Sequence, residues 1–433
     1  MERYSEYKDS GVKWLGEIPS HWEFVAAKKL YLTNDGGVWG TDPTGTDDTI
    51  VIRSTEQDVE GNLFLDNPAR RHLTNSEINK ALLKENDLII TKSSGSINHI
   101  GKTSLIDKEI ATRKCCFSNF IQRIHLKGNA KFYWYVFNNK LIKDQFAILS
   151  STTTGLNNIS SEIINNILLP LLPFEEQDSI VSYLDSVTSK IDRAIAQQQR
   201  MIELLNERKQ IIINNAVTKG LDPNVPMKDS GVEWIGMIPK HWEVRRAKYI
   251  FRIVNDLSKS GEEELLSVSD RTGVTPRSMK NVNMFMSESL IGYKRCQVGD
   301  ICCNVMWMWH GAVGVTEYEG VISPSYCVYR QINKRFINEY LDNLLRIPLL
   351  VKLYSVMSTG LTESRLRLYP SDFLDIFFFI PPIDEQKGIM EFISNKCKPI
   401  EDAIVRLEGQ ISLLQERKQI IINDVVTGKV KVV

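Results

Sequence analysis

Two long stretches of similar sequence constrain the possible folds of this chain most strongly. The octet ERKQIIIN stands at residues 207–214 and returns 209 residues later, at 416–423. Around each octet, apolar residues recur at alternating steps of four and three, the heptad pattern of a helix that packs against another helix. The seam positions are Ile191, Ile195, Gln198, Ile202, Leu205, Lys209, Ile212 and Ala216 in the first copy, and Ile400, Ile404, Leu407, Ile411, Leu414, Lys418, Ile421 and Val425 in the second. We therefore predict two long helices that pair with each other; the alternative is two amphipathic helices that are buried separately.

The heptads also predict the length and the weak points of these helices. Each long helix is predicted to run for about 30 residues, or ~45 Å at 1.5 Å per residue. Pro399 is predicted to lie in the first turn of the second helix, where its missing N–H costs nothing. Lys209 and Lys418 fall on the seam, which costs stability unless each ammonium reaches solvent or an acidic partner. The sequence leaves both possibilities open.

A second motif is repeated nearer the start of each half. Residues 8–23 read KDSGVKWLGEIPSHWE, and residues 228–243 read KDSGVEWIGMIPKHWE. The Gly and Pro residues favour turns, while Trp14, Trp22, Trp234 and Trp242 supply apolar anchors. We predict that each copy is a clasp that docks onto a packed surface; a ligand site formed by the Trp and His residues is the alternative.

Between clasp and helix, each half holds a body of mixed character. Strands are predicted at residues 49–53, 87–91, 120–126, 264–268, 300–305 and 327–332, and helices at residues 132–149 and 336–357. The halves align at Asp87 with Asp300, Gly101 with Gly314, and Arg123 with Arg330. Each body ends in a proline-terminated strand followed by an acidic residue, Glu and Gln. Because the acids at 175–176 begin a helix, we interpret them as residues that favour the helix macrodipole.

The repeat predicts the fold class and the domain boundaries. We expect an α+β protein with two α/β bodies in a pseudo-two-fold arrangement, joined by an antiparallel coiled coil of the two long helices. The predicted domains are 1–173 and 221–381 for the bodies, and 174–220 and 382–433 for the helices.

Composition excludes several classes of protein. No apolar run approaches the ~20 residues of a membrane span, and residues 1–10 lack a signal-peptide core, so we expect no membrane and a cytoplasmic location. Seven cysteines without C-x-x-C spacing indicate a reducing compartment and no metal site. The formal net charge of zero argues against nucleic-acid binding, which usually needs an excess of Lys and Arg.

Catalytic motifs are missing as well. The stretch GSINHIGKT at residues 95–103 has five residues between its glycines, whereas a phosphate-binding P-loop has four. Pro381-Pro382 lacks the acidic or amide residue and the aromatic residue that would flank it in a methyltransferase loop, and no nuclease motif stands out. We therefore predict no catalysis, no cofactor and no metal.

Taken together, the repeated motifs resemble one known family. Both copies of W-x-G-x-I-P-x-H-W-E, the P-x-x-E-Q step and the E-R-K-Q-x-I-I-x-x-x-V-T ending are similar to the DNA specificity subunit of type I restriction–modification systems. The resemblance implies that each body is a target recognition domain that reads one half of a split double-stranded DNA sequence. It implies that the paired helices set the gap between the half-sites and help to dock two methyltransferase subunits. Restriction subunits, which translocate DNA with ATP, would join this core.

Polar and basic residues gather in the loops of both bodies, where they are candidate DNA contacts. Arg pairs with guanine, Asn with adenine, and Lys with phosphate. The predicted DNA-binding residues are Arg70, Arg71, Lys92, Ser93, Ser94, Asn98, Lys102, Arg113, Lys114, Thr153, Thr154, Arg271, Arg277, Lys280, Lys294, Arg295, Trp309, His310, Arg365 and Arg367. The bases that they read do not follow from the sequence. The alternative functions are a coiled-coil scaffold that joins two protein partners, and an enzyme with a site hidden in the bodies.

Overall fold

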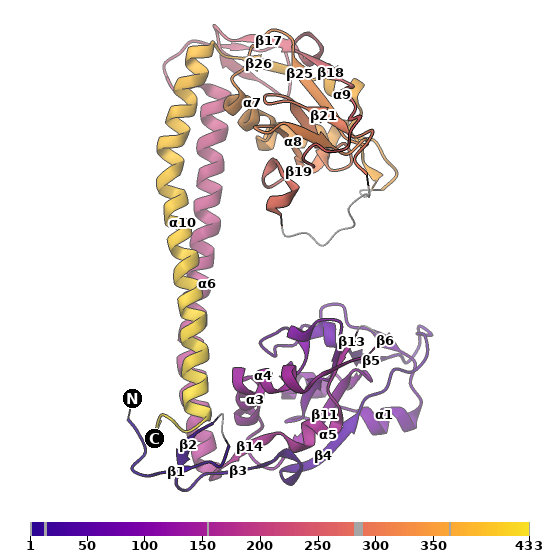
Figure 1. The fold of residues 1–433 in the computed structure, drawn as a ribbon, viewed down its shortest axis with the longest axis vertical. Helices are drawn as coiled ribbons and strands as arrows, with labels where there is room; N and C mark the ends of the chain where they lie inside the picture. The colour runs from indigo at the N-terminus through magenta and orange to yellow at the C-terminus, as the bar shows by residue number, and fades with distance from the viewer. Residues whose placement is uncertain (1, 13–14, 154–155, 281–288, 363–364, 433) are drawn as a thin grey trace. The chain divides into compact units, whose positions relative to one another are not determined.

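The chain folds into two compact units that do not coincide with two halves of the sequence. The computed structural model describes residues 2–12, 15–153, 156–280, 289–362 and 365–432 (Figure 1). Unit 1 comprises Met1–Gln198 with Gly409–Val433, and unit 2 comprises Gln199–Glu408. Each unit therefore contains one body, the start of one long helix and the end of the other. The boundaries of the domains named above stay a prediction.

The two long helices are α6, Phe174–Lys219, and α10, Ile383–Val426. They have 46 and 44 residues, so the predicted length of about 30 was too short. In the additional first turns the apolar residues pack on a body instead of on the other helix: Ile180 and Leu184 belong to the core of unit 1, and Ile389 to that of unit 2. The heptad seam begins only after these turns, which explains the error.

The prediction that Pro399 starts the second helix was wrong, because Pro399 lies inside α10. A proline in a helix interior removes one backbone hydrogen bond and costs ~3 kcal/mol. The helix persists because the residues on either side, Ile393, Cys397 and Ile400, are buried. Tertiary packing overrides the local preference here.

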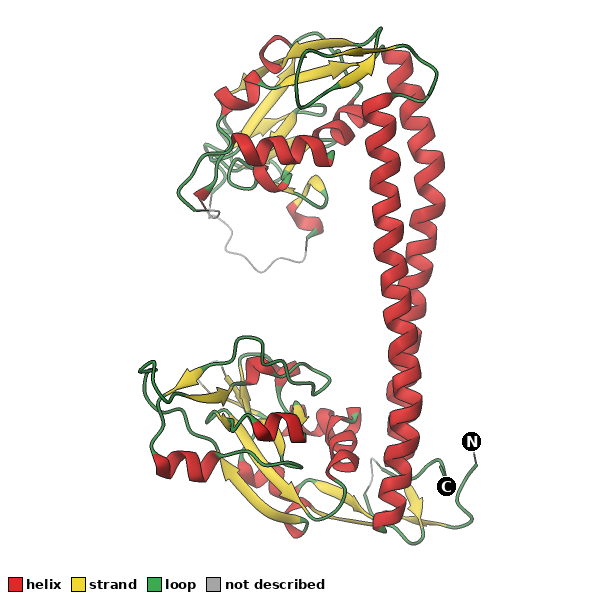
Figure 2. Ribbon diagram, turned by 180° about the vertical axis from the view of Figure 1, so that it is seen from behind, coloured by secondary structure: helices red, strands yellow, loops and turns green. Residues whose placement is uncertain are grey.

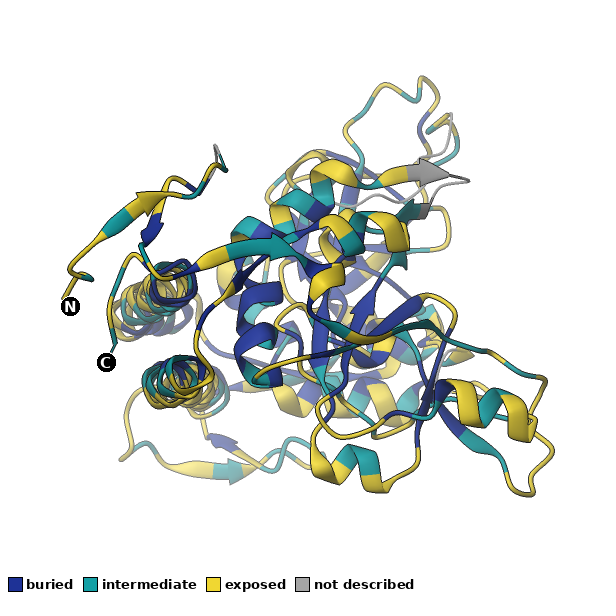
Figure 3. Ribbon diagram, turned by 90° about the horizontal axis from the view of Figure 1, so that it is seen from below, coloured by how far each residue is buried: buried dark blue, intermediate teal, exposed yellow. Residues whose placement is uncertain are grey.

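The predicted pairing of the helices is confirmed within each unit. In unit 1, Lys418 Nζ of α10 donates to Asp192 Oδ1 of α6 at 2.7 Å, and Gln198 Nε2 donates to Gln410 Oε1 at 3.3 Å. The contact partner with the higher residue number in α6 has the lower residue number in α10, so the two helices are antiparallel. In unit 2, Lys209 of α6 donates to Glu401 of α10. Both seam lysines thus have an acidic partner. Seen end-on, both helices carry buried and half-buried residues as well as exposed ones (Figure 3).

The body of unit 1 is built around a four-stranded antiparallel sheet in the order β4-β11-β7-β9. The strands are β4 Tyr31–Gly36, β11 Ile121–Leu126, β7 Leu88–Thr91 and β9 Thr103–Leu105. Helix α3, Ala130–Asn138, packs beside β9 and is followed by α4, Lys140–Leu149. A second sheet contains β10 Cys116–Phe117, β5 Thr49–Ile52 and β6 Arg70–Arg71. These elements confirm the strands and the helical segment predicted for this half.

The body of unit 2 repeats this plan (Figure 2). Its four-stranded sheet has the order β18-β25-β22-β23, with β18 Phe251–Val254, β25 Cys327–Gln331, β22 Ile301–Cys303 and β23 Val313–Val315. Helices α7, Asn338–Leu345, and α8, Pro348–Met357, correspond to α3 and α4. The smaller elements of unit 2 are β19 Leu266–Ser269, β20 Gly273–Pro276, β21 Lys294–Cys296, β24 Gly320–Ile322 and α9 Pro370–Asp375. The smaller elements of unit 1 are α1 Asn75–Ala81, α2 Lys108–Thr112 and α5 Ser161–Asn166.

The predicted alignment of Gly101 with Gly314 needs correction. Thr91 N donates to Lys102 O at 2.9 Å, and Asn304 N donates to Ala312 O at 3.0 Å. Ala312 therefore occupies the position of Lys102, and Gly101 corresponds to Gly311 instead of Gly314. The loop between the two strands is shorter in unit 2, and an alignment of sequence without a gap could not place this deletion.

The clasps are small antiparallel sheets that dock as predicted. In unit 1, β1 Tyr7–Asp9 pairs with β2 Glu17–Pro19, and β3 Glu23–Ala26 pairs with β14 Leu168–Leu171. In unit 2, the equivalent pairs are β15 Met227–Asp229 with β16 Met237–Pro239, and β17 Glu243–Arg246 with β26 Phe377–Ile380. Trp22 and Trp242 are fully buried, whereas Trp14 lies outside the described residues. Among the described residues, no helix combines the length and apolarity that a membrane span requires.

Candidate nucleic-acid interface

A single glutamate at the start of each long helix holds the clasp of its unit. Glu176 Oε1 accepts from Trp22 Nε1 at 3.1 Å and from the Tyr4 hydroxyl at 2.6 Å, while Glu176 Oε2 is 2.9 Å from His21 Nε2. Burial and the contact with Glu176 raise the pKa of Tyr4 far above its usual value, so its hydroxyl stays a donor. In unit 2, Glu385 Oε2 accepts from Trp242 Nε1 at 3.0 Å. These Trp and His side chains of the clasps thus have a structural role, because they hold each clasp on its long helix.

The glutamine that follows each of these glutamates fixes the body on the helix. Gln177 Oε1 accepts from Asn129 N at 2.9 Å, at the start of α3, and Gln386 Oε1 accepts from Ile337 N at 2.9 Å, at the start of α7. Both glutamine side chains are buried. The macrodipole interpretation of these residues was therefore incomplete, and the repeated Glu-Gln pair was the sequence signal for their role.

The acidic and basic pairs around the aligned aspartates are also structural. The predicted alignment of Arg123 with Arg330 was wrong by two residues: Leu88 faces Ile124 as Ile301 faces Tyr329, so His125 occupies the position of Arg330. Asp300 accepts from Arg330 Nε and Nη2, both at 2.7 Å, and this pairing raises the pKa of Arg330. In unit 1, Asp87 lies 3.9 Å from Arg123 Nη1 and 2.8 Å from His125 Nδ1. The side chains of both aspartates are 2% exposed, so these buried carboxylates brace the sheet.

Several predicted DNA contacts of unit 1 lie together on one small sheet. Strand β8, Ser93–Ser94, pairs with β13, Leu156–Asn158, which pairs with β12, Ser151–Thr153. Lys92 adjoins them, and burial lowers its pKa. Asn98 follows in the short helix η3, Ile97–His99, where it is exposed. Thr154 and the side chain of Thr153 lie outside the described residues.

A second group of unit 1 lies on the sheet of β5, β6 and β10 or in the segment that leads from α2 into β10. Arg71 Nη1 donates to Asp42 Oδ1 at 2.8 Å, and its guanidinium lies 4.7 Å from the ring of Trp39. Arg70 Nη1 donates to Asp48 O at 3.4 Å. Arg113 Nη2 donates to Leu65 O at 3.3 Å, and Lys114 follows it, exposed. The structure therefore separates the predicted residues of unit 1 into two groups.

Lys102 does not belong to either group. Its side chain is 3% exposed, and Nζ donates to Ser54 O at 2.7 Å and to Gln57 O at 2.6 Å. Burial lowers the pKa of this ammonium. Since it has no path to a ligand, we remove Lys102 from the candidate DNA contacts and regard it as a support for the loop at residues 54–57.

In unit 2, several predicted basic residues have partners within the protein. Lys280 Nζ donates to Ser267 Oγ at 3.1 Å and to Ser269 Oγ at 3.2 Å. Lys294 Nζ donates to Tyr326 O at 2.6 Å. Arg295 lies 3.4 Å from Glu263 Oε1. Arg277 begins the short helix η5, Arg277–Met279, and Arg271 lies in the turn between β19 and β20.

The remaining candidates of unit 2 lie near one another. Trp309 and His310 belong to the short helix η6, Met308–His310, which packs on α8. Arg367 pairs with Thr359 through two backbone hydrogen bonds of 3.0 Å, and Arg365 lies in the loop between them. Leu368 N donates to Val305 O at 3.3 Å, which joins this loop to the segment before η6. Within the described part of the chain, no cluster of His, Cys, Asp and Glu could hold a metal ion.

Known proteins share this frame. Residues 62–204 match the family described as "Type I restriction modification DNA specificity domain". The type I restriction enzyme MjaVIII specificity subunit of Methanocaldococcus jannaschii is 24% identical over 378 residues, which cover 83% of this chain and 82% of that protein. The putative MjaX specificity subunit of the same organism is 22% identical over 454 residues, covering 98% of both chains.

A solved structure shares the fold. It describes complex assembly and conformational transition of the type I R-M system, and one of its chains matches this one with a TM-score of 0.66 and 14% identity, covering 94% of this chain and 98% of that chain. The match supports the predicted class of two α/β bodies with paired long helices. Through its specificity domain and these relatives, the chain is similar to the specificity subunits of type I restriction–modification systems, and the match to a DNA specificity domain supports recognition of a DNA sequence.

Proposed function

We propose that this chain reads a DNA target in two separate parts, one with each unit, and directs methyltransferase and restriction subunits to it. One observation carries the proposal. The two units share their frame, including Glu176 with Glu385 and Gln177 with Gln386, but differ in the loops between equivalent strands. A repeated frame with different loops suits two readers of different sequence.

The loops differ in chemical character as well as in sequence. Unit 1 presents hydroxyl and amide groups on Ser94 and Asn98, which suit hydrogen bonds to base edges. Unit 2 presents the aromatic and cationic side chains of Trp309, His310 and Arg367. Different donors, acceptors and apolar surfaces select different bases. We therefore propose that the half-sites differ and that the complete target is asymmetric.

The neutral charge of the chain is compatible with this role if partner subunits neutralise much of the phosphate backbone. The chain has 53 basic and 53 acidic residues, so its own phosphate contacts are local. Methyltransferase subunits that surround the duplex would supply the remaining cations. Because cellular DNA is the proposed ligand, we also propose that the complex acts in the cytoplasm.

A repeated apolar stripe on the outer face of the long helices suits these subunits. In unit 2, Leu204 and Ile211 of α6 are exposed by 44% and 52%; in unit 1, Leu413 and Ile420 of α10 are exposed by 65% and 52%. The residues of each pair are seven positions apart and therefore lie on one helix face. Since the same stripe occurs in both units, we propose that each unit docks one copy of the same methyltransferase.

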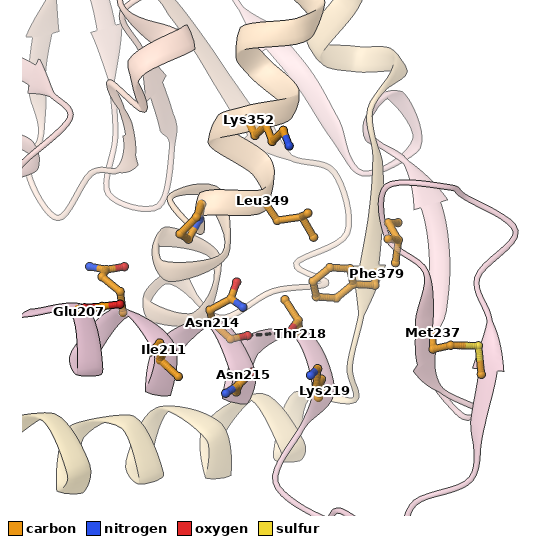
Figure 4. Close-up of a pocket in the computed structure, with 13 residues that line it drawn as sticks. Glu207, Ile211, Asn214, Asn215, Thr218, Lys219, Met237, Leu349, Lys352 and Phe379 are labelled. Carbon is orange, nitrogen blue, oxygen red and sulfur yellow. Dashed lines mark hydrogen bonds between the residues drawn. The ribbon is translucent and has the colours of Figure 1, made fainter.

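In unit 2 this stripe continues into a groove of about 670 Å³ (Figure 4). Ile211 of α6, Leu349 of α8 and Phe379 of β26 are among the residues that line it. Exposed apolar grooves of this kind typically mark protein interaction sites. A helix that presents apolar residues at positions i, i+3 and i+7 would fill it.

The reading of DNA is tested by sequencing modified bases in cells that express this chain with its methyltransferase. We expect methylation at one split sequence. Exchange of residues 24–167 for the same region of a relative should change one half of that sequence and leave the other half and the spacer unchanged. If the complex assembles but neither binds nor modifies a specific sequence, the chain is a scaffold and the proposal is wrong.

The role of the helices as a ruler is tested by inserting seven residues after Gln198 and seven after Glu408. A heptad insertion in each helix preserves the phase of the seam. We expect the same two half-sites with a different spacer. An unchanged spacer in a folded, active complex would contradict this part of the proposal.

The docking surface is tested by Leu204→Glu and Leu413→Glu, each alone and together. We expect native mass spectrometry to show one methyltransferase subunit with either single variant and none with the double variant. Asn206→Glu, which is exposed on a different face of α6, is the matched control. Two bound subunits in the double variant would locate the docking site elsewhere.

A further inference from the structure

An exposed aromatic cluster stands on the connection between β22 and β23 of unit 2. Trp307 is 55% exposed although Trp is a large apolar residue that is highly buried on average. Its ring stacks on that of Trp309, with a centroid distance of 5.9 Å and an interplanar angle of 15°. The ring of His310 contacts Trp309 edge-on at 4.8 Å. Trp307 thus forms the outer layer of a short stack.

The backbone under this stack is held firmly. His310 N donates to Trp307 O at 3.0 Å, and Ala312 N donates to the same oxygen at 3.1 Å. Trp309 Nε1 donates to Met306 O at 3.0 Å, which orients the inner ring. A Cβ atom on Gly311 would lie 3.1 Å from Val351 of α8, so the turn rests closely on that helix. A ligand would therefore meet a preformed platform and would not have to order it.

The cluster adjoins the other candidate contacts of unit 2. Met306 N donates to Asn304 Oδ1 at 3.2 Å, and Asn304 Nδ2 donates to the Tyr326 hydroxyl at 2.8 Å. The backbone of Tyr326 in turn accepts from Lys294. At the equivalent connection of unit 1, the short helix η3 carries Ile97, Asn98 and His99 and has no large aromatic residue. The stack is thus a feature of unit 2 alone at this place in the repeat.

We propose that Trp307 is a wedge that packs against a base-pair step in the half-site read by unit 2, and that Trp309 positions it. The inference rests on the proposed function, because it requires a specific duplex at this face. Apolar side chains that enter between base pairs partly unstack them, and pyrimidine–purine steps yield most easily. The wedge would therefore add selectivity for a flexible step without a hydrogen bond to a base.

The experiment uses the complete complex with its methyltransferase subunits and a duplex that contains its mapped target. 2-Aminopurine replaces one base at a time through both half-sites and reports local unstacking by its fluorescence. With the native chain, we expect a rise at one step of one half-site. Trp307→Ala should abolish this rise and weaken specific binding roughly tenfold or more, while Trp307→Phe should retain part of both effects.

Two further variants separate the wedge from a structural effect. Tyr249→Ala removes another exposed aromatic residue of unit 2, in the short helix η4, Ala247–Tyr249, and should change neither signal. Trp309→Ala should reduce the unstacking signal, and Trp309→Phe should restore it, because a ring at this position supports Trp307. If the native complex binds its target specifically but Trp307→Ala changes neither affinity nor fluorescence, the proposed role of Trp307 as a wedge is wrong. If the native complex binds no specific sequence, the proposed function itself fails.

Discussion

Lys418 of α10 donates to Asp192 of α6 at 2.7 Å, on the seam between the two long helices of unit 1. Lys418 is also 3.5 Å from Glu60 in the body. The repeat gives unit 2 the equivalent pair, Lys209 with Glu401. A charged residue at a seam position specifies register, because a shifted helix would bury the lysine without its acid. We therefore infer that these pairs fix the register of the two helices more than they stabilise the fold.

Removal of the Asp192 carboxylate should lower the free energy of unfolding only moderately. The carboxylate of Asp192 is 51% exposed, so we expect Asp192→Ala to reduce the free energy of unfolding by about 1 kcal/mol in urea denaturation. Glu203→Ala, which breaks the exposed pair with Arg200 on the same helix, is the control and should change it by at most about 0.5 kcal/mol. A loss above about 3 kcal/mol would show that the pair behaves as a buried one.

Removal of Glu176, which accepts the hydrogen bonds of the clasp, should lower the free energy of unfolding more. In Glu176→Ala the buried Trp22 N–H and the Tyr4 hydroxyl lose their acceptor, so we expect a loss of roughly 2–3 kcal/mol. The neighbouring Glu175 is exposed, and Glu175→Ala should be nearly neutral. Urea denaturation monitored by tryptophan fluorescence measures both. Equal effects of the two variants would mean that Glu176 does not hold the clasp.

The ion pair between Arg330 and Asp300 in unit 2 should give a larger difference in stability between a variant and its control. Arg330→Ala leaves Asp300 buried without its bidentate partner, and we expect a loss of about 3 kcal/mol. Arg252 lies opposite Arg330 on the neighbouring strand and is exposed, so Arg252→Ala serves as the control. Thermal denaturation should show a clearly lower Tm for the first variant alone. If Asp300→Asn together with Arg330→Ala were no more stable than Arg330→Ala, the uncompensated charge would not be the cause.

Lys92 offers a test of phosphate contact. Lys92→Gln should weaken DNA binding at all sequences alike and reduce the slope of log K against log salt concentration by about 0.9. Lys29→Gln, on the short helix η1, Ala27–Lys29, removes an equal charge elsewhere in unit 1 and should leave the slope unchanged. Fluorescence anisotropy at several salt concentrations measures it. A change in sequence preference without a change in slope would instead assign Lys92 to a base.

The local patterns of the chain determined most of its framework. Heptads predicted the paired helices, runs of strand-forming residues predicted strands such as residues 120–126, and the repeated clasp and Glu-Gln motifs predicted a duplicated plan. These signals are local, because each depends on residues within one or two turns or along one strand. The resemblance to specificity subunits followed from the same motifs.

Only the tertiary structure decided which residues are available to a ligand. Lys102 and Lys280 are both basic residues in polar loops, yet the first is buried on two carbonyl groups and the second reaches two serines of a neighbouring strand. Pro399 stays within a helix because distant side chains bury the turns around it. Burial and partners depend on residues far apart in the sequence, so periodicity and motif spacing contain no measure of them.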